Sequence, residues 1–280
     1  MVTISARTGA FAAGSAAERG LSRAGDIITS IGNTPLLRLG RIEDLYRLPQ
    51  GVELYAKAEY ANPGGSVKDR AALYMIRDGE MSGALTQEKI ILDASSGNTG
   101  IAYAMIGASL GYRVEICLPD SASVERKRLL QLYGAAIVMT PGAEGTDGAV
   151  GEARRRYTEN PTRYFYPDQY NNPANWQAHY YGTGPEIWEQ TGGRITHFVG
   201  VVGTSGTLMG VARRLKEFNV AITIVEVQPD STFHGLEGMK HMESAIVPGI
   251  YEPGRANYRL GTDTEAAQAM TRALARYEGV

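Results

Sequence analysis

Short runs of β-branched residues alternate with longer segments of helical periodicity from Ile27 onward. This alternation is typical of strands joined by crossover helices in a parallel sheet, so the sequence predicts an α/β fold. Strands are predicted at residues 52–59, 89–94, 112–119, 135–139, 196–202 and 222–227. Helices are predicted at residues 68–79, 99–110, 124–133, 148–157, 175–191 and 207–218, where apolar residues recur at three- and four-residue spacing. Residues 251–258 show no regular pattern.

Breaks in the strand and helix periodicities divide the chain into segments. The stretches "PGAEGTDGAVG" at 141–151 and "NNPANW" at 171–176 interrupt the pattern with Pro, Gly and Asn. We expect an N-terminal lobe over residues 26–160 and a C-terminal lobe over 161–280. Residues 1–25 are small and lack periodicity, so a disordered tail is predicted there.

Charge and composition narrow the class of ligand. The chain has 28 basic and 30 acidic residues and a net charge of -2, which argues against binding to nucleic acid or to a membrane surface. Small-molecule substrates are expected instead. The single cysteine, Cys117, forms no intrachain disulfide and suits the cytoplasm, and the four histidines lack metal-ligand spacing, so no metal is predicted.

Two glycine-, serine- and threonine-rich loops lie between a predicted strand and a predicted helix. They comprise Ser95, Ser96, Gly97, Asn98 and Thr99, and Gly203, Thr204, Ser205, Gly206 and Thr207. Such junctions present free backbone N–H groups and hydroxyls to a carboxylate or a phosphate, although a tight turn with an N-cap explains each loop alone equally well. Neither loop has the spacing of a dinucleotide fingerprint or a P-loop. Loops at the carboxyl ends of parallel strands gather at one crevice, so both loops are expected to face a shared ligand.

Lys68 stands in "NPGGSVKDR" at the start of a predicted helix, where a positive charge is poorly placed for the helix dipole. A Schiff base with pyridoxal phosphate relieves part of that conflict, and the phosphate of this cofactor suits a glycine-rich cradle. The alternative is a surface lysine paired with Asp69.

Several motifs together resemble the cysteine synthase family of fold-type II pyridoxal-phosphate enzymes, with most likeness to its B branch. They are "IGNTPLLRL", "NPGGSVKDR", "SSGNTG", "NPANWQAHYYGTGPEIWEQTGGRITHF" and "GTSGT", in the family's order between residues 26 and 280. The resemblance implies a two-lobed, tryptophan synthase β-like fold with parallel sheets, and a homodimer.

The resemblance also implies a role for each site residue. Lys68 would hold pyridoxal 5'-phosphate covalently, Asn98 would bond its 3' oxygen, and residues 203–207 would cradle its phosphate. The α-carboxylate of the amino-acid substrate would be bound by Ser95, Ser96, Thr99 and Gln169. Lys240, in "GMKHM", matches a basic entrance segment of the B branch and would favour an anionic sulfur donor or phosphoserine, although a plain surface lysine is an equal alternative.

The implied reaction is β-replacement on O-acetylserine or O-phosphoserine by sulfide or thiosulfate, in the biosynthesis of cysteine. Three alternatives share the fold or the lysine: a cystathionine synthase, a serine or threonine dehydratase, and a pyridoxal-phosphate-binding fragment with little turnover. The stretch "TGPEIWEQTGGRITHF" favours the sulfhydrylase branch.

The chain departs from the family pattern in three places. Ser95 replaces the usual threonine, and Ser205 replaces glycine or threonine. The third departure is the end of the chain at Val280, before the family's segment that contacts the pyridine nitrogen. We therefore expect an incomplete second lobe with apolar faces open to water, low stability and weak activity, and a natural carboxyl terminus beyond Val280.

Overall fold

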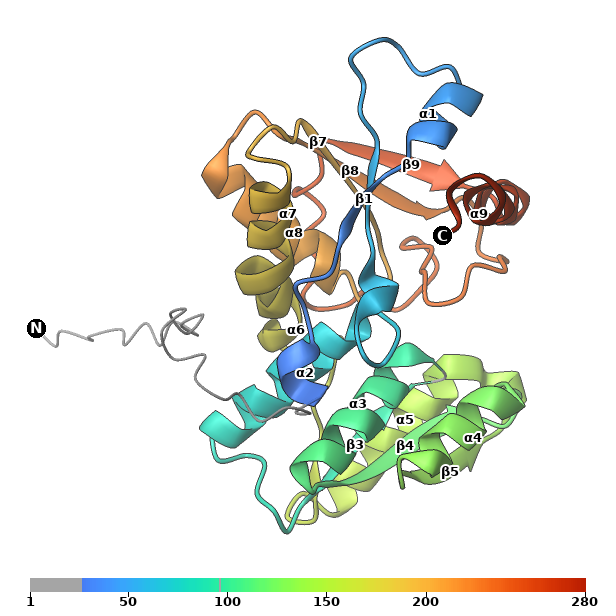
Figure 1. Ribbon diagram of the computed structural model, residues 1–280. Helices are drawn as coiled ribbons and strands as arrows, with labels where there is room; N and C mark the ends of the chain where they lie inside the picture. Colours follow the sequence, from blue (N-terminus) through green and yellow to red (C-terminus); the bar gives the residue numbers. More distant parts are fainter. Residues whose placement is uncertain (1–26, 96) are drawn as a thin grey trace, which may run out of the picture.

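A parallel four-stranded sheet organises the lower half of the molecule (Figure 1). The computed structural model describes residues 27–95 and 97–280, so the predicted tail and Ser96 lie outside the described residues. The strands are β3 (Ile90–Ala94), β4 (Arg113–Pro119), β5 (Ala136–Thr140) and β6 (Tyr164–Phe165), in the order β5-β4-β3-β6. The first three confirm predicted strands.

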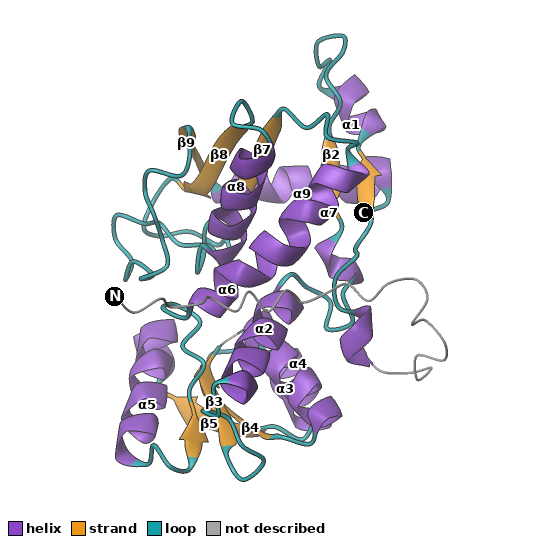
Figure 2. Ribbon diagram, turned by 90° about the vertical axis from the view of Figure 1, so that its left-hand side faces the viewer, coloured by secondary structure: helices purple, strands orange, loops and turns teal. Residues whose placement is uncertain are grey.

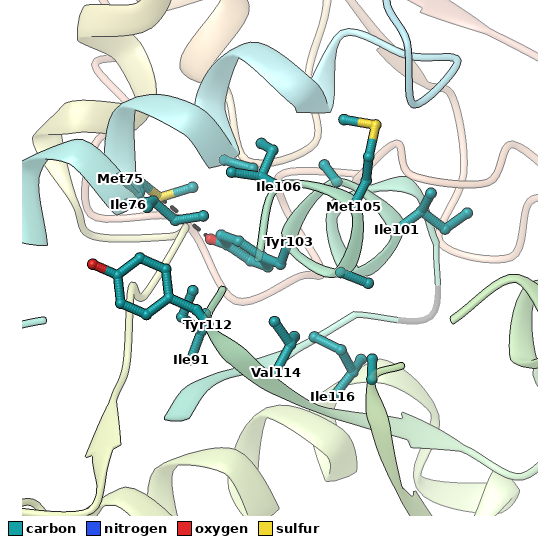
Figure 3. Packing of buried hydrophobic residues seen from close by; sticks show 14 of the residues in the cluster. Met75, Ile76, Ile91, Ile101, Tyr103, Met105, Ile106, Tyr112, Val114 and Ile116 are labelled. Atoms are coloured by element: carbon teal, nitrogen blue, oxygen red, sulfur yellow. Dashed lines mark hydrogen bonds between the residues drawn. The ribbon is translucent and has the colours of Figure 1, made fainter. Parts of the chain in front are cut away.

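Helices cover both faces of this first sheet. α2 (Lys68–Met81), α3 (Asn98–Leu110) and α4 (Val124–Leu132) share one face, and α5 (Gly145–Glu159) packs on the other. Side chains alternate along β3, so Ile91 faces α3 whereas Leu92 faces α5. Figure 3 shows Tyr103 of α3 between the helix α2 and the strands.

Cys117 lies on the α5 face of the first sheet and is fully buried. Burial raises the pKa of its thiol to about 12, which keeps it protonated and unreactive at neutral pH. It is a core residue.

A second parallel sheet, β7-β8-β9, lies in the upper half of the molecule. Its strands are β7 (His197–Val201), β8 (Thr223–Pro229) and β9 (Tyr258–Thr262), and α8 (Gly206–Phe218) packs against one face through Leu208 and Leu215. On the opposite face, the register aligns Val199, Val225 and Tyr258 in one row and Val201, Val227 and Leu260 in the next. The outer members of both rows are more than half exposed, so this face of the second sheet is apolar and open in the described residues.

The strand predicted at 52–59 is wrong in length and in partner. Only β2 (Tyr55–Lys57) is extended, and it pairs antiparallel with β1 (Leu36–Arg38) outside both parallel sheets. The chain turns back after α1 (Gly40–Leu45), so these two nearby segments form a local ribbon instead of joining a sheet through a crossover. α1 packs against α9 (Thr264–Glu278), as Figure 2 also shows, and Ile42 N donates to Glu278 Oε1 at 2.8 Å.

The helix predicted at 175–191 is confirmed as a continuous helical segment over residues 173–190, but this segment contains a π-helical turn that was not predicted. α6 (Pro173–Ala178) leads into a π-helix over His179–Thr183, and α7 (Gly184–Gln190) follows. Pro185 lacks an N–H group and cannot continue the i→i−4 ladder, which accounts for the change of helix type at this point. α6 packs on both α2 and α8 and thereby connects the two halves of the molecule.

The remaining elements were not predicted. They are 3-10 turns over Ile27–Ser30, Glu59–Ala61 and Gly142–Glu144, together with α1, α9, β1, β6 and β9. The irregular segment before Tyr258 is confirmed, since β9 begins only there. The lobe boundary at residue 160 stays a prediction. β6, which lies just beyond that residue, still pairs with β3 of the first sheet. Across the described residues, the structure has no helix long and apolar enough to cross a membrane.

Candidate active site

Lys68 is the first residue of α2 and follows a loop that its neighbours hold in place. Asp69 is fully buried, and its Oδ2 accepts a hydrogen bond from Gly64 N at 2.6 Å. Ser66 Oγ accepts from Lys68 N at 3.2 Å. The pairing of a surface Lys68 with Asp69 is therefore not what the structure shows, because the lysine is half-buried and the carboxylate binds the loop backbone.

The half-buried position changes the acid-base behaviour of Lys68. Desolvation of the ammonium group lowers the pKa of Lys68 below its usual value. A larger fraction of the side chain is then a neutral amine at physiological pH, and only the neutral amine is a nucleophile or a proton acceptor.

The first of the two predicted loops does connect a strand to a helix. β3 ends at Ala94 and α3 begins at Asn98, which is exposed at the helix start. Ser95 Oγ accepts from Gly97 N at 3.2 Å. The hydroxyl of Thr99 donates to Gln169 Oε1 at 3.1 Å, and Gln169 Nε2 donates to Ala94 O at 3.1 Å. Thr99 and Gln169, seventy residues apart in sequence, thus lie side by side as the resemblance implies.

The second loop also lies where predicted, between β7 and the start of α8. Ser205 has a left-handed backbone with φ 69° and a buried hydroxyl without a hydrogen-bond partner. A Cβ on Gly203 would lie 2.1 Å from Gly238 O, and one on Gly206 would lie 2.0 Å from Asn175 Oδ1, so both positions require glycine. The unpaired buried hydroxyl of Ser205 beside a helix N-terminus fits a phosphate group.

Asn175 was not predicted as a site residue, yet it connects the second loop to Gln169, the partner of Thr99 in the first loop. Its Nδ2 donates to Gln169 O at 2.6 Å and to Thr204 Oγ1 at 3.1 Å. It is buried in α6, the helix between α2 and α8. Its place in the motif "NPANW" was the available signal, although nothing in that stretch names its partners.

His179 is the second residue that the sequence analysis missed. It lies in the π-helix, where Nδ1 is 2.9 Å from Thr183 Oγ1 and Nε2 is 3.3 Å from Thr207 Oγ1. Burial, aided by the positive charge of Arg70, lowers the pKa of His179 to about 3. The ring is therefore neutral and supports the Thr207 hydroxyl at the start of α8.

A neutral buried histidine predicts acid sensitivity. Only the unfolded chain binds a proton at this residue between its usual pKa and pH 3, so stability falls as the pH falls. Lowering the pH from 7 to 5 should cost about 2 kcal/mol of unfolding free energy through His179. Urea unfolding of the wild type and of His179→Gln at both pH values checks this. Equal losses in the two proteins would contradict it.

Lys240 lies in the loop between β8 and β9, close to the second junction. Its backbone N–H donates to Val202 O at 2.9 Å, and its side-chain Nζ lies 5.1 Å from the ring centroid of Tyr170. Burial lowers the pKa of Lys240, opposed by the negative charge of Asp147. The side chain lines a small pocket together with Arg154 and Asp147, so two basic groups and one carboxylate face the same opening.

The described residues contain no group of three or more His, Cys, Asp and Glu side chains arranged to hold a metal ion. A lysine with a lowered pKa and two strand-to-helix loops suited to anions fit the site of a pyridoxal-phosphate enzyme that acts on amino acids.

Comparison with known proteins agrees with this class. The family model described as "Pyridoxal-phosphate dependent enzyme" matches residues 27–280, and the chain belongs to this family. A cysteine synthase of Aquifex aeolicus is 49% identical over 256 residues, which cover 91% of this chain and 77% of that protein. Cysteine synthase B of Escherichia coli is 41% identical over 251 residues, 90% of this chain and 80% of that protein.

Solved structures show the same fold. The crystal structure of a cysteine synthase from Entamoeba histolytica has a TM-score of 0.86 and 35% identity, over 100% of this chain and 81% of that one. The predicted fold class and the resemblance to the cysteine synthase family are confirmed.

Proposed function

We propose that this protein is a pyridoxal-phosphate-dependent cysteine synthase that replaces the O-linked substituent of an activated serine with sulfur. The observation that carries the proposal is the position of Lys68 at the start of α2, half-buried and with a lowered pKa. In the same chain, two strand-to-helix loops are connected through Gln169 and Asn175. The identity to named cysteine synthases supports the choice of reaction.

Each loop serves a different anion in this proposal. The backbone N–H groups and hydroxyls of residues 203–207 hold the cofactor phosphate, with Thr207 oriented by His179. Thr99 and Gln169 orient the α-carboxylate together with Ser95, and Ser96 takes part by resemblance alone. Asn98, exposed at the start of α3, is assigned to the 3' oxygen of the cofactor.

Lys68 moves the proton. Bound pyridoxal phosphate supplies an electron sink that stabilises negative charge at Cα of the substrate. The neutral Nζ of Lys68 accepts the α-proton, the bond from Cβ to the ester oxygen breaks, and acetate or phosphate leaves. A bond from sulfur to Cβ then forms, and Nζ returns the proton to Cα.

The test is a substrate panel followed by mass spectrometry of the products. Purified protein is supplied with pyridoxal phosphate, O-acetylserine or O-phosphoserine, and sulfide. We expect cysteine and stoichiometric acetate or phosphate. Cystathionine from added homocysteine, or an oxoacid with ammonia from serine or threonine, would favour the alternative enzymes. Cofactor absorbance without turnover would favour a binding fragment.

The position of Lys240 supports a finer proposal about the sulfur donor. Lys240 and Arg154 together outweigh the single carboxylate of Asp147 at this opening, and the net positive charge favours a dianionic donor such as thiosulfate, or phosphoserine, over sulfide. Lys240→Ala should raise KM for thiosulfate about 10-fold, as expected when a partly buried charge pair of about 1.4 kcal/mol is lost, and change KM for sulfide less than twofold. Steady-state kinetics with both donors checks this, and equal changes would remove the selective role.

Assembly and compartment are part of the same proposal. A homodimer is proposed because symmetric dimers are the commonest soluble oligomers. Light scattering over a dilution series tests it, and a single monomer mass throughout would reject it. The cytoplasm is proposed because Cys117 is a free, buried thiol. Fractionation of the source cells tests this assignment, and recovery in a membrane or exported fraction would reject it.

A further inference from the structure

Arg70 lies two residues after Lys68 and is the centre of a buried charge cluster. It is 4% exposed, and its guanidinium makes five hydrogen bonds. Nε and Nη2 donate to the two oxygens of Glu59 at 2.7 and 2.8 Å. Nη1 and Nη2 donate to the two oxygens of Glu186 at 2.6 and 2.7 Å, and Nη2 also donates to Thr34 Oγ1 at 3.2 Å. Both carboxylates are therefore bound in bidentate geometry.

A second cation completes the cluster. Lys57 Nζ lies 2.7 Å from Glu186 Oε2 and also donates to Thr34 Oγ1 at 2.6 Å. Two positive side chains thus face the two carboxylates of Glu59 and Glu186, so the buried charges balance. These contacts unite three motifs of the sequence that the proposed chemistry leaves unused: "IGNTP", the residues flanking "NPGG", and "GPEIW".

The cluster holds the loop before Lys68 at both ends. Glu59 opens that loop, and its Oε2 also accepts from Asn62 Nδ2 at 2.9 Å. Asn62 Oδ1 accepts from Gly32 N at 2.9 Å. Arg70, in the first turn of α2, follows the loop. The Glu59 to Arg70 contact therefore closes the segment that presents Lys68.

Glu186 connects this segment to the phosphate cradle. It lies on α7, which follows directly from the π-helix containing His179. His179 in turn contacts Thr207 in the cradle. Two side-chain contacts, Arg70 with Glu186 and His179 with Thr207, thus connect the two ends of the proposed site. The lysine would bind the aldehyde end of the cofactor, and the cradle would bind its phosphate end.

We infer that Arg70 and Glu186 are positioning residues that set the spacing between Lys68 and the phosphate cradle. The inference rests on the proposed role of Lys68. A cofactor held at both ends binds well only when the spacing of its two contacts matches its length, since misplacement of a reacting group by 1 Å weakens both binding and rate. A merely structural cluster would affect folding without affecting cofactor affinity.

The experiment compares Glu186→Gln with Glu115→Gln. Glu115 is a matched control because it is likewise largely shielded from solvent, accepts from Arg156 Nε at 3.1 Å and from Tyr164 OH at 3.2 Å, and lies in the first sheet outside the proposed site. Cofactor-free protein of each variant is titrated with pyridoxal phosphate while its visible absorbance is followed, and its urea midpoint is measured separately. Glu186→Gln should weaken cofactor binding at least about 10-fold and slow its borohydride-trapped attachment to Lys68, whereas Glu115→Gln should leave both within twofold.

Arg70→Lys is the second variant, because it keeps the charge and loses the bidentate fork. It should weaken cofactor binding in the same direction even if Glu186→Gln does not fold. Cofactor affinity within twofold of wild type in the folded variants, with Lys68 labelled in each, would overturn the inference alone. Labelling of another lysine in the wild type would overturn the proposed site and the inference together.

Discussion

Lys68→Ala is expected to abolish cysteine formation and covalent attachment of the cofactor. The half-buried amine has a lowered pKa and is assigned both the attachment and the transfer of the α-proton. Loss of a general base alone slows reactions by about 10² to 10⁴-fold, and loss of attachment adds to this. We therefore expect cysteine formation to fall at least about 10³-fold. Mass-spectrometric assay of cysteine, with peptide mapping after borohydride reduction, measures both effects.

The matched control is Lys216→Ala. Lys216 lies near the C-terminal end of α8, away from the proposed cradle at the start of that helix, and its ammonium donates to Val220 O at 2.9 Å. This variant should keep wild-type turnover and cofactor absorbance. Turnover by Lys68→Ala within a few fold of the wild type, or a label on another lysine, would remove Lys68 from the site.

Gly203→Ala is expected to damage both stability and cofactor binding. The added Cβ would lie 2.1 Å from the carbonyl oxygen of Gly238, which is backbone and has no rotamer to move aside. Overpacking of this kind typically costs about 1–3 kcal/mol of unfolding free energy. To relieve this contact, the loop 238–240 would have to shift away from the cradle. The shift would strain the hydrogen bond from Lys240 N to Val202 O, which holds the loop there. Cofactor affinity should fall together with the urea midpoint.

Gly151→Ala provides the control for this change. Gly151 lies in α5, and the added Cβ would have no heavy atom within 4 Å beyond the adjacent backbone of its own helix, so alanine should be neutral or stabilise the helix by up to about 1 kcal/mol. Chemical denaturation and cofactor titration of both variants decide the matter. A Gly203→Ala protein as stable and as well loaded as Gly151→Ala would show that the cradle tolerates a side chain.

β3, β4, β5, β7 and β8 were predictable because a strand between two helices leaves a clear change of period. β3 and β4 are also buried along nearly their whole length. β1, β6 and β9 were missed or misjudged because they are short or exposed, so their extended conformation depends on partners distant in sequence. α9 was not predicted, and none of its residues is buried. The structure identifies it by its cap at Asp263 and its contact with α1.

The strand-to-helix junctions and the lysine at a helix start were determined by the sequence itself, since glycine, serine and threonine favour such turns whatever lies around them. Motif resemblance added the cofactor and the reaction class. Only the tertiary structure decided which residues meet: Thr99 with Gln169, Asn175 with Thr204, His179 with Thr207, and Arg70 with Glu186. These contacts depend on the packing of α2, α6, α7 and α8, and helix packing is a property of side-chain surfaces far apart along the chain.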